Sequence, residues 1–90
     1  MSVEMILAIT NEKGLHARAS AKFVEVVEAH DAEAHVSRDG MSAAGDSIMG
    51  LLMLAAANGS SIAVTTSGNQ ADELATALKS LVENKFGEGK

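Results

Sequence analysis

The residues best suited to chemistry lie in one short stretch, Gly-Leu-His-Ala-Arg-Ala-Ser, at positions 14–20. His16 offers a titratable imidazole, and Arg18 adds a permanently charged guanidinium two residues later. A strand-like pattern gives way to a helical one here, so both side chains are expected at a helix N-terminus. Unpartnered backbone N–H groups and the positive end of the helix dipole attract anions there. The spacing therefore predicts a site that could hold a phosphoryl group.

Each of these two residues also has a simpler interpretation. His16 could cap the helix or lie exposed in a loop, and Arg18 could be a solvated surface arginine. A cation in the first helical turn is unfavourable by roughly 0.3–1 kcal/mol, so a bound anion would explain Arg18. A neutral imidazole has a free nitrogen lone pair, which would make His16 a nucleophile for phosphoryl transfer.

Other kinds of site find little support in the sequence. The chain has no cysteine, and its histidines (His16, His30 and His35) lack a metal-ligand spacing. We therefore expect no metal site and no cofactor. Ser60 and Ser61 have no partnered base that would suggest a hydrolase, and no Gly-rich phosphate loop of the Walker type is present.

The overall composition limits the kinds of partner. A formal net charge of −5 argues against a nucleic-acid-binding protein, which normally shows a basic face, and suits docking to a basic protein surface. No apolar run approaches the ~18 residues of a membrane span, and the N-terminus lacks a basic leader. We expect a cytoplasmic module that does not insert into membranes.

The pattern of apolar residues predicts one domain over residues 1–90, because this length supports a single small core. Strands are expected at 3–10, 32–38, 41–44 and 61–66, and the first, apolar at most positions, should be largely buried. Helices are expected at 16–30, from 48 to the Asn58-Gly59 pair, and at 71–82. The order βαββαβα predicts an α+β fold, in which helices cover one face of a four-stranded, mainly antiparallel sheet.

Short polar segments mark the boundaries of these elements. Gly14 is expected to take a positive φ in the first turn, and Asp39-Gly40 is typical of a type I′ hairpin. Asp46 or Ser47 can cap the second helix. The tail Gly87–Lys90 is expected to fray.

The helices divide their apolar residues between core and surface. The first is expected to bury one face, made of Ser20, Phe23, Val24 and Val27. The second is more apolar than one buried face requires, so Leu51 and Leu54 should be core while Ile48, Met49 and Leu52 stay partly exposed. Methionine suits a surface that meets several partners.

Two motifs together resemble a known family. Gly14-Leu15-His16-Ala17-Arg18 follows the first strand, and Ser47-Ile48-Met49-Gly50 opens the second helix. Together with the element order, these motifs resemble those of the HPr family. Its members are the histidine-containing phosphocarriers of the bacterial phosphoenolpyruvate-dependent phosphotransferase system. The resemblance covers nearly the whole chain. It implies an open-faced sandwich and a protein that shuttles phosphoryl groups between larger enzymes rather than a stand-alone enzyme.

The resemblance also implies roles for the first motif. His16 would accept a phosphoryl group on Nδ1 from enzyme I and pass it to enzyme IIA-type acceptors. Arg18 would steady the phosphate, together with the backbone N–H groups of Ala17, Arg18 and Ala19.

The second motif would supply docking and regulation. Partners would dock on an apolar patch made of Ala17, Ala21, Ile48, Met49 and Leu52. Ser47 would lie where an HPr serine kinase/phosphatase acts in some lineages. A carrier that presents one patch to successive partners is expected to be a monomer.

Two departures from the family pattern stand out. Proline usually follows the arginine, whereas this chain has Ala19, from which we expect a small change in rate or loop order. Glu25 and Glu28 occupy outer helix positions that are often basic in sugar-transporting members. These charges favour the nitrogen-type regulatory branch.

Two other functions remain open at this point. A small-molecule-binding module of the ACT type shares the βαββαβ order, and its ligand loop would be Asn11–Leu15. The third helix and the His16/Arg18 pair argue against it. A pure regulator acting only through Ser47 would have no need of His16.

Overall fold

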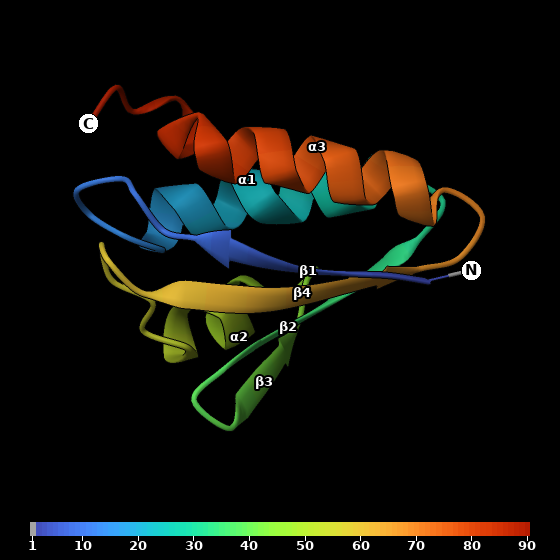
Figure 1. The fold of residues 1–90 in the computed structure, drawn as a ribbon, viewed down its shortest axis with the longest axis horizontal. Coiled ribbons are helices and arrows are strands. Elements are labelled where there is room, and N and C mark those ends of the chain that lie inside the picture. The colour runs from blue at the N-terminus through green and yellow to red at the C-terminus, as the bar shows by residue number, and fades with distance from the viewer. Residues whose placement is uncertain (1) are drawn as a thin grey trace.

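Residues 2–90 are described in the structure, which is a computed structural model. Its strands are β1 (Ser2–Ala8), β2 (Glu33–Arg38), β3 (Met41–Ala44) and β4 (Ser61–Ser67). Its helices are α1 (Ala17–Glu28), α2 (Ile48–Met53) and α3 (Ala71–Glu83), followed by a 3₁₀ turn, Lys85–Gly87. The strands pair in the order β1-β4-β2-β3, and each pairing is antiparallel (Figure 1). The expected element order and antiparallel sheet are confirmed.

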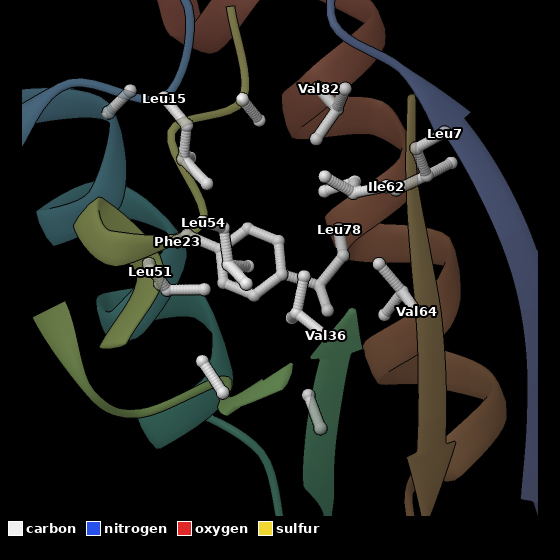
Figure 2. Packing of buried hydrophobic residues seen from close by; sticks show 14 of the residues in the cluster. Leu7, Leu15, Phe23, Val36, Leu51, Leu54, Ile62, Val64, Leu78 and Val82 are labelled. Carbon is white, nitrogen blue, oxygen red and sulfur yellow. The ribbon is translucent and has the colours of Figure 1, made fainter. Parts of the chain in front are cut away.

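One face of the sheet carries the core. Side chains alternate along β4, where Ile62 and Val64 are buried and their neighbours are partly exposed. Phe23 of α1 lies between Leu51 of α2 and Leu54, the residue after α2, on one side and Leu78 of α3 on the other (Figure 2). All three helices therefore pack against the same face, as the sequence predicts. The whole expected face of α1 is buried: Ser20, Phe23, Val24 and Val27.

The prediction of a largely buried first strand is wrong. β1 ends at Ala8 and lies at the edge of the sheet, where helices cover only one of its two faces. Alternate side chains therefore point to the open face, and Ile6 is 70% exposed. An apolar run alone does not distinguish a strand buried on both faces from a strand of an open-faced sheet.

The second helix is shorter than predicted. It ends at Met53 rather than near Asn58, and Ala55 has a φ of +52°, which is incompatible with continuing a right-handed helix. Arg38 donates a hydrogen bond from Nη1 to the carbonyl oxygen of Leu54 at 3.0 Å. This bond satisfies a carbonyl that the helix leaves free at its end. Leu51 and Leu54 are core residues, as expected.

The C-terminal tail does not fray as the sequence analysis expected. Phe86 is only 1% exposed and belongs to the core. Lys22 Nζ donates to the carbonyl oxygen of Phe86 at 2.7 Å, and the Glu12 N–H donates to that of Lys90 at 2.9 Å. The last residues therefore lie beside the loop between β1 and α1 (Figure 1). Burial of one aromatic side chain outweighs the flexibility of the terminal glycines.

The predicted turns and cap have the expected geometry. Gly14 has a φ of +66°, and a Cβ there would lie 2.5 Å from the carbonyl oxygen of Ala56. Asp39 and Gly40 both have positive φ, at 51° and 80°, as a type I′ turn requires. Ser47, rather than Asp46, caps α2 by accepting the Gly50 N–H at 3.0 Å.

Because Phe86 is buried, Phe86→Ala should lower the free energy of unfolding by about 3–5 kcal/mol, the usual range for removing a core phenylalanine. Urea unfolding followed by circular dichroism measures it. Glu83→Ala, an exposed change at the end of α3, is the control and should stay within about 0.5 kcal/mol of the parent. A loss below about 1 kcal/mol for Phe86→Ala would mean that the tail is loose.

Candidate functional site

The turn between β1 and α1 fixes where the helix begins. The Leu15 N–H donates to the carbonyl oxygen of Ala56 at 2.8 Å, and the Leu15 side chain is buried. Asn58 Nδ2 donates to the carbonyl oxygens of Thr10 and Asn11, both at 3.1 Å. The turn is thus tied to the loop before β4, and His16 follows directly after it with a side chain that is partly exposed.

His16 is the N-cap of α1. Its backbone is extended, with φ −82° and ψ −176°, and its Nδ1 accepts a hydrogen bond from the Arg18 N–H at 3.3 Å. A ring nitrogen thereby fills the role that a serine or aspartate oxygen usually has at this position. The backbone of Ala17, Arg18 and Ala19 forms the first turn, where N–H groups lack intrahelical partners. Nδ1 therefore lies at the positive end of the helix.

The other ring nitrogen meets a residue that the sequence analysis missed. His16 Nε2 and Glu88 Oε2 form a short hydrogen bond, and both side chains are partly buried. The second oxygen, Oε1, accepts a bond from Asn11 Nδ2 at 2.9 Å. The same Nδ2 donates to the carbonyl oxygen of Gly14 at 2.7 Å. Asn11 is fully buried and joins the turn to the tail.

These contacts set the charge state of Glu88. The hydrogen bond from Asn11 is the largest cause of a Glu88 pKa below the ordinary value of 4.5. Burial acts in the opposite direction and raises the pKa. The hydrogen bond and charge of His16, and the charge of Lys13, lower it further. Glu88 is therefore a carboxylate at neutral pH.

Basic side chains gather around the ring. An open cavity of about 790 Å³ beside His16 is lined by Lys13, Arg18, Lys22 and Lys90, four of the seven lysines and arginines in the chain. Two carboxylates, Glu12 and Glu88, lie along the same cavity. A locally positive cavity on a chain with a net charge of −5 attracts an anion to this place.

Arg18 lies where an anion could use it. Its side chain is exposed, and no ion pair to it occurs among residues 2–90. Ala19, which stands where the family has proline, is fully buried as the third residue of α1. Its backbone N–H has no intrahelical acceptor there, so alanine and proline both fit this position.

The predicted docking patch is an exposed apolar surface. Met49 is 69% exposed, Ile48 and Ala17 are exposed, and Leu52 and Ala21 are partly buried. Helices α1 and α2 pack against each other, so the five residues lie on neighbouring helices. Met53, which the sequence analysis did not include, is 66% exposed on α2 and extends this apolar surface.

Within residues 2–90, no group of three or more His, Cys, Asp or Glu side chains is placed to hold a metal ion. Over the same residues, no helix is both long and apolar enough to cross a membrane.

One sequence signal could have revealed Glu88. Leu74, Leu78, Val82 and Phe86 recur every four residues, which indicates that the chain stays on the core beyond α3. That repeat predicts that the tail stays packed against the helices. Its contact with His16, however, depends on how α3 packs against α1. Asn11 could not be found in this way, because its partners come from both ends of the chain.

Because its pKa is lowered by folding, the Glu88 carboxylate adds stability that is complete above its ordinary pKa and is lost as pH falls through the folded value. We expect the parent to exceed Glu88→Gln in free energy of unfolding at pH 7. The difference should shrink below about pH 4.5. Urea unfolding at several pH values measures it, with Glu12→Gln as the control for loss of charge. A difference in free energy of unfolding that does not change with pH would contradict the hydrogen bonds of Glu88 to Asn11 and His16.

Comparisons with known proteins identify the family to which the sequence is similar. A family model described as "PTS HPr component phosphorylation site" matches residues 3–84. The phosphocarrier protein HPr of Pseudomonas aeruginosa is 44% identical over 84 residues, which cover 92% of this chain and 93% of that protein. The phosphocarrier protein NPr of Escherichia coli is 37% identical over 89 residues, covering 98% and 99%.

Solved structures show the same fold. HPr-C-His from Thermoanaerobacter tengcongensis superposes with a TM-score of 0.91 at 34% identity, covering 96% of this chain and 97% of that one. HPr from Bacillus anthracis superposes with a TM-score of 0.85 at 34% identity, covering 90% and 96%. The match over most of the chain, together with the shared fold, shows that this protein belongs to the HPr family of phosphocarriers of the phosphotransferase system.

Proposed function

We propose that this chain carries a phosphoryl group on Nδ1 of His16, taken from phospho-enzyme I and passed to enzyme IIA-type acceptors. The observation that supports this most is the place of Nδ1, at the positive end of α1 beside a cavity with four basic residues. Family membership favours this function over the small-molecule module considered from sequence. We infer that the protein acts as a cytoplasmic monomer.

The transfer step needs no further reactant. The Nδ1 lone pair attacks phosphorus on the donor phosphohistidine, a new N–P bond forms, and the electron pair of the broken N–P bond stays on the donor nitrogen. Little covalent chemistry is left to the protein, so positioning and charge stabilisation determine the rate. The second transfer, to the acceptor, runs by the same exchange.

Backbone and side-chain groups in the first turn of α1 would hold the phosphoryl oxygens. Phosphorylation of Nδ1 uses its lone pair, so the Arg18 N–H that now donates to it becomes free for a phosphoryl oxygen. The N–H groups of Ala17 and Ala19 belong to the same turn. The Arg18 guanidinium, which is exposed at this end of the helix, can add a bidentate contact.

Docking would use the apolar patch on α1 and α2. Ala17, Ala21 and Glu25 follow each other at spacings of four along α1. The acidic side chains of Glu25 and Glu28 therefore flank the patch, and both residues are exposed. Charges at the rim of an interface select partners. We infer that they favour acceptors of the nitrogen-type branch.

Ser47 would connect docking to regulation. Its Oγ caps α2, and Ile48 and Met49 of the docking patch follow directly. A phosphate on Ser47 would add negative charge beside the apolar patch and next to Asp46. We infer that an HPr serine kinase/phosphatase would weaken docking through this charge.

The site of phosphorylation is tested by phosphorus NMR after incubation with phosphoenolpyruvate and enzyme I. The parent should show an acid-labile phosphohistidine signal, and His16→Ala should show none, because no other residue caps α1 with a ring nitrogen. His35→Ala, which removes an exposed histidine of β2, should keep the full signal. A phosphohistidine signal in His16→Ala would contradict the proposal.

The docking patch is tested by steady-state transfer from phospho-enzyme I. Met49→Asp places a charge at the centre of an apolar interface, so KM should rise about tenfold or more while kcat stays close to that of the parent. Met41→Asp is a matched control, since Met41 is also exposed but lies on β3. Equal kinetics for the two variants would place the interface elsewhere.

A further inference from the structure

We propose that Glu88 is a positioning residue, whose carboxylate holds the Nε2 proton of His16 and so keeps Nδ1 free to accept the phosphoryl group. The proposal rests on the function proposed above and assigns to the C-terminal tail a part in it.

The hydrogen bonds around the ring define which nitrogen carries the proton. A backbone N–H can only donate, so Nδ1, which accepts from Arg18, must present its lone pair. A carboxylate can only accept, so the neutral ring must donate from Nε2 to Glu88. The two contacts favour the same tautomer from opposite sides of the ring. The favoured tautomer is the one in which Nδ1 is nucleophilic.

The carboxylate is itself held in place. Asn11 Nδ2 binds Oε1 at 2.9 Å, which leaves Oε2 directed at the ring. The tail that carries Glu88 is fixed by the burial of Phe86 and by the bond from Lys22 Nζ to its carbonyl oxygen. The ring therefore lies between a helix terminus and a fixed carboxylate, a geometry that leaves it little freedom to turn.

The carboxylate also matches the charge change of the reaction. When the Nδ1 lone pair forms the N–P bond, the ring keeps its Nε2 proton and gains positive charge. Glu88 faces that charge at Nε2, across the ring from the phosphoryl group, so it stabilises the ring without lying next to the phosphoryl oxygens. Loss of the carboxylate should therefore affect both the tautomer and the rate.

The tautomer is measured without any partner protein, by proton–nitrogen NMR of the ¹⁵N-labelled neutral ring. The parent should be mainly protonated on Nε2, and Glu88→Ala should gain a clear fraction protonated on Nδ1. Glu88→Gln keeps an acceptor and should resemble the parent. Glu12→Ala removes a carboxylate from the same cavity but leaves both ring contacts, so it should also resemble the parent. An unchanged tautomer in Glu88→Ala would overturn the proposal.

The rate is measured by single-turnover transfer from phospho-enzyme I. We expect Glu88→Ala to be about tenfold slower, which corresponds to about 1.4 kcal/mol. Glu88→Gln, which restores the acceptor but not the charge, should lie between Glu88→Ala and the parent. A transfer rate for Glu88→Ala within twofold of the rate for Glu12→Ala would overturn the positioning role of Glu88, even if the tautomer shifts. Failure of the parent itself to accept phosphate would instead refute the proposed function.

Discussion

The double hydrogen bond from the Asn11 amide is the interaction on which the site depends. One buried nitrogen donates both to the turn, at the carbonyl oxygen of Gly14, and to the tail, at Glu88. The first bond fixes the turn after which α1 begins, and so makes His16 its N-cap. The second brings a carboxylate to the far side of the same ring. Segments from the two ends of the chain thereby determine how one imidazole is presented.

The short second helix suits a carrier that meets several proteins. Six residues bury only Leu51, while Met49 and Met53 stay exposed. A longer helix is excluded because Ala55 has a positive φ and Arg38 binds the carbonyl oxygen of Leu54. The chain thus exposes flexible apolar side chains on a helix that packs against α1, instead of burying them. Methionine adapts to differently shaped partners, so such a surface suits docking to more than one protein.

Local patterns in the sequence predicted the order of the elements, the hairpin at Asp39-Gly40 and the division of α2 between core and surface, and they limited the α2 cap to Asp46 or Ser47. The positions of His16, Arg18 and Ser47 at helix N-termini were predicted in the same way, because helix termini leave local signals. The exposed face of β1 depends on the sheet being covered by helices on one side only, which no residue in the strand records. Glu88 and Asn11 lie 77 residues apart, so their contact follows only from the packing of α3 and Phe86. Flexible residues such as the terminal glycines do not reveal that a neighbouring aromatic side chain fixes them.

The proposed function requires the fold to leave Nδ1 of His16, and not Nε2, as the phosphoryl acceptor. The most direct measurement is the phosphorus–nitrogen coupling in the phosphorylated chain carrying ¹⁵N in its histidine rings. We expect coupling of the phosphorus to Nδ1 of His16, because Nε2 is engaged by Glu88. Coupling to Nε2 would contradict it, since the phosphoryl group would then lie where the structure places a carboxylate.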